Sequence, residues 1–172
     1  MKKNILTILL MITSVCVINA QNNQKYDWVS GAWDEGLTAV ELKGKYGFID
    51  KKSTLVIPLK YDDVKHFREG LCAVKLNGKW GFINKANKVI ITIKYDDAEN
   101  FYDGLAEVEL NGKTGFINGI GNIIIPFKYE AAGAFADGMA SVKLNGKWIY
   151  IDKKGKEYLT EYDAKKALGI KY

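Results

Sequence analysis

The sequence predicts an all-β tandem array of about four three-stranded units, each 34 residues long. Two phrases recur at this interval along the 172 residues. The first reads GKYGFID, GKWGFIN, GKTGFIN and GKWIYID, and it begins at Gly44, Gly78, Gly112 and Gly146. The second is an acidic residue before a glycine, at Glu35-Gly36, Glu69-Gly70, Asp103-Gly104 and Asp137-Gly138. Two phrases with one shared period indicate a repeat architecture, in which each unit buries its apolar face against its neighbours.

Within one unit the residues predict a three-stranded β-meander. In the second unit, Asn77-Gly78 separates two short runs of mainly apolar residues, and Asn-Gly is a typical hairpin turn because both residues tolerate positive φ. A third run, from Lys88 to Tyr95, alternates apolar and polar side chains as a half-buried strand does. A linker of about eight residues, such as Asp96 to Asp103, follows. We expect hairpin cores near residues 37–61, 71–95, 105–129 and 139–162.

The prolines predict that the third strand of each unit is an edge strand. Pro58 and Pro126 occupy equivalent positions in their units, where Thr92 stands in the second unit. Proline cannot donate a ladder hydrogen bond, so this strand should pair on one side only. Helical periodicity is weak, except for one turn around residues 131–134 and the tail after Asp163. We expect a stacked, solenoid-like or superhelical array, with a small propeller-like ring as the alternative.

The first twenty residues predict a secretory signal, so that residues 21–172 form the repeat domain. Two lysines precede an apolar stretch over residues 5–17, and Ala20 offers a small residue before the expected cleavage site. The expected location is therefore periplasmic, cell-surface or secreted. The alternatives are a retained membrane anchor or a lipid attached at Cys16. The apolar stretch is shorter than the ~20 residues that cross a bilayer, so no membrane span is expected in the mature chain.

Composition argues against nucleic-acid binding. Removal of the signal's two lysines lowers the net charge from +5 to +3, and the remaining lysines alternate with acids rather than forming a basic stripe. One thiol, Cys72, remains in the mature chain, and the equivalent positions hold threonine or alanine. We therefore expect a buried, unreactive cysteine.

The sequence predicts no catalytic, cofactor-binding or metal site. His66 is the only histidine, and alanine or asparagine replaces it in the other units. No nucleophile elbow, phosphate loop or metal-ligand cluster is present. The repeated acids are expected to accept backbone N–H bonds in turns. They stand before the glycines, as given above, and after the tyrosines, at Asp62, Asp96 and Glu130.

The aromatic residues fall into two repeated series. The first contains Tyr46, Trp80 and Trp148, each followed two residues later by another aromatic residue on the same strand face. We expect core packing for this series; the alternative is an exposed ladder in which these three rings contact a sugar or peptide. Thr114 interrupts such a ladder in the third unit. The second series is expected to pack each linker onto the core. It contains Trp33, Phe67, Phe101 and Phe135.

The phrases Lys-Trp-Gly-Phe-Ile-Asn from Lys79, Asp-Gly-Leu-Ala from Asp103 and Ile-Ile-Pro-Phe-Lys-Tyr from Ile124 resemble WG repeats, also called KWG repeats. The resemblance extends over nearly all of the mature chain, with departures at Thr114 and Ile149. It implies a β-rich bacterial repeat scaffold, often exported, without catalytic residues. The expected function is an exported, non-catalytic scaffold that binds a protein or a cell-envelope glycan. The alternatives are a purely structural envelope component and, third, a glycan-active enzyme.

Overall fold

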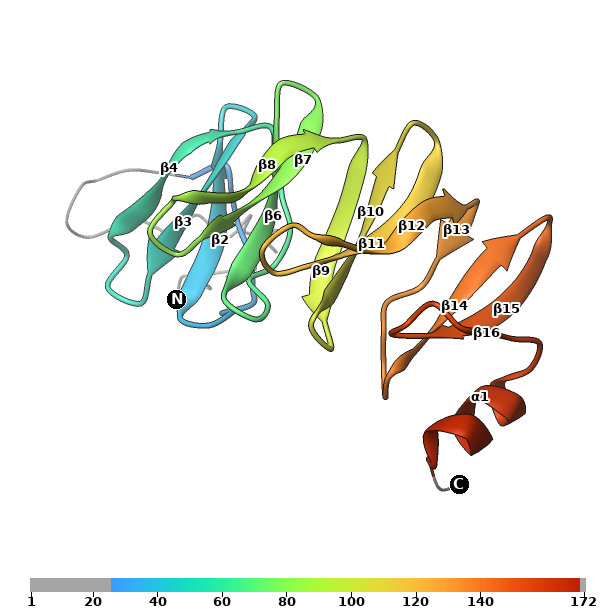
Figure 1. The fold of residues 1–172 in the computed structure, drawn as a ribbon. Coiled ribbons are helices and arrows are strands. Elements are labelled where there is room, and N and C mark those ends of the chain that lie inside the picture. Colours follow the sequence, from blue (N-terminus) through green and yellow to red (C-terminus); the bar gives the residue numbers. More distant parts are fainter. Residues whose placement is uncertain (1–25, 171–172) are drawn as a thin grey trace, which may run out of the picture.

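Four antiparallel sheets of four strands each follow one another along the chain (Figure 1). The computed structural model describes residues 26–170, so the predicted signal and Cys16 lie outside the described residues. Within each sheet the strands are ordered as they occur in the sequence. This arrangement confirms the all-β tandem array.

The strand bounds repeat from sheet to sheet. The first sheet contains β1 (Trp28–Val29), β2 (Leu37–Leu42), β3 (Lys45–Asp50) and β4 (Leu55–Tyr61). The second contains β5 (Asp63–Val64), β6 (Leu71–Leu76), β7 (Lys79–Asn84) and β8 (Val89–Tyr95). The third contains β9 (Asp97–Tyr102), β10 (Leu105–Leu110), β11 (Lys113–Asn118) and β12 (Ile123–Tyr129). The fourth contains β13 (Ala131–Ala132), β14 (Met139–Leu144), β15 (Lys147–Asp152) and β16 (Glu157–Tyr158).

The central hairpin of each sheet is closed by a two-residue turn with positive φ at both positions. In the second sheet these residues are Asn77 (φ 53°) and Gly78 (φ 78°), and Leu76 pairs with Lys79 across the turn. Such turns match the right-handed twist of the flanking strands. The predicted hairpin is therefore present.

The linkers differ from the sequence prediction because each supplies a short first strand to the next sheet. Val64 of β5, for example, lies opposite Val74 of β6. Two of these linker strands contain only two residues, which is too short for an alternating pattern to be recognised. The helical turn predicted around residues 131–134 is wrong, because Ala131 and Ala132 form β13.

The glycine of the Trp-Gly phrase allows the third strand to approach closely. An ideal Cβ on Gly81 would lie 2.6 Å from Cα of Ile93 and 2.7 Å from the carbonyl oxygen of Ile91. The register between β7 and β8 shifts on either side of this glycine, as at a β-bulge. In the fourth unit β16 pairs only with Tyr150 and Ile151, so on that side no strand lies against position 149 and isoleucine fits there.

The third strand of each predicted meander, which is the fourth strand of its sheet, lies at a sheet edge, as the prolines predicted. Strands β4, β8 and β12 each pair with one neighbour in the sheet order. Pro58 and Pro126 are exposed on these strands, where the missing N–H groups break no ladder.

The sheets are joined by aromatic contacts from the linkers. Phe67 meets Phe48 of the preceding sheet with ring centroids 5.0 Å apart. The same edge-to-face contact recurs for Phe101 on Phe82 at 4.9 Å and for Phe135 on Phe116 at 4.8 Å. The predicted packing of the linkers is therefore confirmed for these three phenylalanines. It is wrong for Trp33, which lies in the loop between β1 and β2 and is 46% exposed.

The array is open, and its two ends lie far apart (Figure 1). Helix α1 (Glu161–Leu168) packs against the fourth sheet and buries Ala164 completely. Thr160 caps its first turn by accepting a hydrogen bond from the Asp163 N–H, and Gly169 ends it in the left-handed conformation. The third strand of this unit, expected to reach Tyr162, ends at Tyr158. Within residues 26–170, no helix combines the length and apolar character needed to cross a membrane.

Candidate functional site

The acidic residue before the glycine binds the turn of the following unit in the first three units. Glu35 accepts a hydrogen bond from the Gly70 N–H at 3.0 Å, and Asp103 accepts one from Gly138 at 2.8 Å. Glu69 binds Gly104 in the same way. We call these three bonds the inter-unit clasps. They confirm that the carboxylates accept backbone N–H bonds, and they add that the bond crosses from one unit to the next.

Lysines from the turns between the second and third strands strengthen two of the clasps. Lys85 Nζ lies 2.9 Å from Glu35 Oε2, and Lys153 Nζ lies 2.5 Å from Asp103 Oδ1. The hydrogen bond from each lysine is the main reason that the pKa of its acid is lowered. These carboxylates are therefore ionised and already occupied at neutral pH.

The acids after the tyrosines are occupied in a different way. Asp62 accepts from the Gly78 N–H at 3.3 Å, and Asp96 accepts from the Asn111 N–H at 2.6 Å. Glu130 binds the equivalent turn through Gly146. Each acid therefore fastens an Asn-Gly hairpin turn, which is a structural role.

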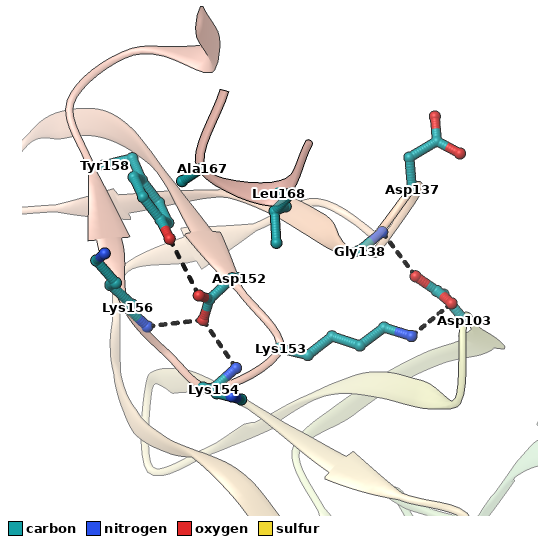
Figure 2. Close-up of a pocket in the computed structure, with 10 residues that line it drawn as sticks. All are labelled: Asp103, Asp137, Gly138, Asp152, Lys153, Lys154, Lys156, Tyr158, Ala167 and Leu168. Carbon is teal, nitrogen blue, oxygen red and sulfur yellow. Dashed lines mark hydrogen bonds and ion pairs between the residues drawn. The ribbon is translucent and has the colours of Figure 1, made fainter. Parts of the chain in front are cut away.

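A pocket of about 670 Å³ lies at the end of the array (Figure 2). It lies between α1 and the turn that joins β15 to β16, and loops from the third and fourth units complete it. Its lining residues are Asp103, Asp137, Gly138, Asp152, Lys153, Lys154, Lys156, Tyr158, Ala167 and Leu168. Charged groups of both signs therefore surround a small apolar floor.

One wall of this pocket is fixed by Asp152. Its side chain is largely buried and accepts hydrogen bonds from the N–H groups of Lys154 at 2.8 Å and Lys156 at 3.0 Å. The Tyr158 hydroxyl donates a third bond at 3.2 Å (Figure 2). Asn84 closes the equivalent turn of the second unit with the same two backbone bonds. Asp152 therefore holds the turn and is not a free acid.

Asp137 is the exception among the clasp acids. It stands at the fourth clasp position, but its carboxylate accepts no hydrogen bond from residues 26–170 and is exposed. Figure 2 shows this carboxylate directed away from Asp103 and Lys153. Helix α1 follows β16 at the place where a further unit would begin, and Leu168 comes within 3.9 Å of an ideal Cβ on Gly138. The pocket therefore resembles a joint between units in which the clasp acid, Asp137, has no backbone N–H partner among the described residues.

The three aromatic residues considered as ligand contacts lie in different environments. Trp80 is 4% exposed, and the ammonium groups of Lys65 and Lys75 lie 5.5 and 5.7 Å from its ring centre, whereas Trp148 is 55% exposed. Tyr46 is half-buried, with its ring edge-to-face against Trp28. These rings do not form one continuous exposed row, and none of them lines the C-terminal pocket.

A smaller cavity of about 170 Å³ lies beside the only histidine. His66 Nδ1 is 2.5 Å from Asp34 Oδ2, and Arg68 approaches the other oxygen of this acid at 3.7 Å. The Ser30 hydroxyl nearby accepts a hydrogen bond from the Ala32 N–H.

Cys72 is fully buried, and burial raises the pKa of its thiol, as expected for a packed cysteine. Among the described residues, no group of three or more acid, histidine or cysteine side chains is arranged to hold a metal ion.

Glu107 is a half-buried acid that the sequence analysis did not single out. It stands on β10 where other units have Ala39, Ala73 and Ser141. Burial, followed by the charges of Glu99, Asp97 and Glu109, raises its pKa from the ordinary 4.5 to about 7, against a smaller opposing effect of Lys65.

A raised pKa in the folded state predicts that stability falls as the pH increases. The contribution of Glu107 is fully present below about pH 4.5 and is lost as the pH rises through about 7. We expect a melting temperature roughly 3–6 °C higher at pH 5 than at pH 8, and we expect Glu107→Gln to remove most of this difference. Scanning calorimetry at both pH values tests this, and an unchanged pH dependence in the variant would contradict it.

The sequence profile of the family described as WG containing repeat matches four consecutive stretches, at residues 25–46, 46–80, 80–113 and 115–148. No curated protein matches the chain significantly. The four matches span more than half of the chain and follow the succession of sheets. The chain therefore belongs to the WG repeat family.

Proposed function

We propose that this protein is an exported, non-catalytic scaffold that binds a polypeptide segment of a partner protein at its C-terminal pocket. One observation carries the proposal: Asp137 is a clasp acid without a clasp. At the three preceding joints the same position accepts a backbone N–H, so Asp137 offers a partner chain the contact that a further unit would make.

The pocket favours a polypeptide over a cell-envelope glycan. Sugar rings stack on open aromatic faces, but the Tyr158 ring is covered by the Lys156 ammonium at 5.1 Å, and its hydroxyl is bound to Asp152. A backbone turn, in contrast, supplies the N–H donor that Asp137 lacks. Leu168 offers an apolar contact beside it.

The state of the charged groups supports a non-catalytic role. Asp103 is paired with Lys153, and Asp152 is held by three donors, so neither carboxylate is available as an acid or base. Incubation with peptidoglycan fragments should release no product, and turnover would favour a glycan-active enzyme instead.

Export is part of the proposal, and amino-terminal sequencing of the native protein should find Gln21 as the first residue. An intact Met1 or a lipidated Cys16 would contradict export with cleavage after Ala20.

Asp137→Asn is expected to weaken capture of the partner by about five- to tenfold, because a hydrogen bond to a charged acceptor contributes roughly 1.5–3 kcal/mol and one to the neutral asparagine oxygen only about 0.5–1.5 kcal/mol. Asparagine tolerates the positive φ of this position, so the fold should be kept. The measurement is a quantitative pull-down from envelope extract with the variant and the parent protein side by side.

Asp97→Asn is the matched control. Asp97 accepts only from the neighbouring Ala98 N–H, which asparagine can also bind, and it lies outside the pocket. The control should capture the partner as the parent does. Capture of nothing by the parent would favour a purely structural envelope component, and equal capture by Asp137→Asn would refute the pocket.

A further inference from the structure

The third strands of the first three units form one repeated flank of the array. Strands β4, β8 and β12 are edge strands, and their outward positions repeat every 34 residues. We define the third-strand flank by three exposed lysines and three apolar residues. They are Lys60, Lys94, Lys128, Val56, Ile90 and Ile124. Unlike the tryptophan position, this pattern is present in each of these units.

The lysines of the flank are held in equivalent places by the tyrosines that follow them. The Lys60 ammonium lies 5.0 Å from the centre of the Tyr61 ring, and the distances for the next two units are 5.2 and 5.0 Å. Lys128 also pairs with Glu157 at 2.7 Å. Among residues 26–170, Lys60 and Lys94 have no acidic partner within ion-pair distance. Two of the three positive charges of the flank are therefore not compensated by an ion pair.

The flank is also hollowed where the second unit meets the third. A recess of about 110 Å³ lies between β8 and the turn at Gly121, beside Lys94 and Tyr95. At the preceding joint the Tyr61 hydroxyl donates a hydrogen bond to Asn87 Oδ1 at 2.6 Å. Gly121 occupies the equivalent position and has no side chain, so the Tyr95 hydroxyl is left without that partner. A phenol and an ammonium group therefore border one small recess.

We propose that the third-strand flank binds an extended, acidic segment of a polypeptide that crosses successive units. Stacked sheets lie about 10 Å apart. A chain in the extended polyproline II conformation completes one turn in three residues and advances about 3.1 Å per residue, so acids at every third residue lie on one side of it, about 9 Å apart, and would meet successive lysines. The apolar row favours a polypeptide over an anionic glycan, because glycans carry no aliphatic side chains. The flank is separate from the C-terminal pocket and goes beyond the function proposed for it.

The probe is a labelled peptide of about ten residues with glutamate at every third position and leucine or serine between. Its isomer has the same composition, but its glutamates are grouped at one end. Fluorescence anisotropy should show tighter binding of the spaced peptide. Replacing Lys60, Lys94 and Lys128 together by glutamate should weaken its binding by about tenfold or more. Replacing the exposed residue Ile124 by serine as well should weaken the binding of the spaced peptide further.

The matched control replaces Lys43, Lys147 and Lys166 by glutamate, since these exposed lysines lie outside β4, β8 and β12, and their chain neighbours are not paired with those strands. It changes the net charge equally and should alter the affinity by less than about twofold. Equal loss in the control, equal binding of the two isomers, or equal affinity for dextran sulfate would each overturn the proposal in favour of unspecific charge attraction. Asp137→Asn should bind the spaced peptide normally, which separates a failure of the flank from a failure of the pocket.

Discussion

Replacing Trp80 by alanine is expected to lower the free energy of unfolding by about 3–5 kcal/mol, the range for removing a large buried aromatic side chain. The ring is 4% exposed, within the core shared by the second and third sheets. Two lysine ammonium groups also lie over the ring, and their cation–π contacts would be lost. Urea denaturation of the variant and the parent measures the difference.

Trp148→Ala is the internal control for this prediction. The residue stands at the same repeat position but is 55% exposed, so its replacement should change stability by about 0.5 kcal/mol or less. Similar losses for the two variants would show that the repeat position, rather than burial, sets the energy. If Trp80→Ala left the free energy of unfolding unchanged, the result would favour the exposed aromatic ladder that the sequence analysis gave as the alternative.

Gly81→Ala is expected to cost about 3 kcal/mol, because the added methyl group would overlap the backbone of β8. The overlapping atoms are the Cα of Ile93 and the carbonyl oxygen of Ile91, which cannot rotate away as a side chain could. The thermal unfolding midpoint reports the loss, and the strand bounds of a crystal structure would show any displacement of β8.

Gly31→Ala provides the comparison, since no atom lies within 4 Å of an ideal Cβ there and φ is not positive. This change should leave stability within about 0.5 kcal/mol of the parent. If Gly81→Ala were equally harmless, the close approach of β8 could not be the reason for glycine in the Trp-Gly phrase.

The features that the sequence predicted correctly depend on local chemistry that each unit repeats. Asn77-Gly78 indicates a tight turn by itself, and Pro58 indicates an edge strand by itself. The contact of Phe67 with the preceding sheet could also be predicted, because its period matched that of the hairpins.

The features that were missed arise where the repetition ends or is too short to recognise. Trp33 is exposed because its unit is the first of the described array, which no residue type reveals. Strand β5 contains two residues and leaves no periodic pattern. The C-terminal pocket depends on where α1 packs, and Asp137 differs from its three counterparts in that α1, rather than another sheet, follows its unit. A search for the repeat acid without a partner 35 residues later would have singled it out.

The inter-unit clasps make the length of this array easy to change. Each acid finds its glycine 35 residues further along the chain, whichever unit it belongs to. A duplicated segment of 34 residues would therefore bring both halves of a new joint with it, and its neighbours would need no compensating substitutions. Inserted before the terminal helix, such a copy would lengthen the molecule and move Asp137 to a new outermost position. The constant spacing of the acids and glycines thus allows the array to lengthen by duplication of whole units.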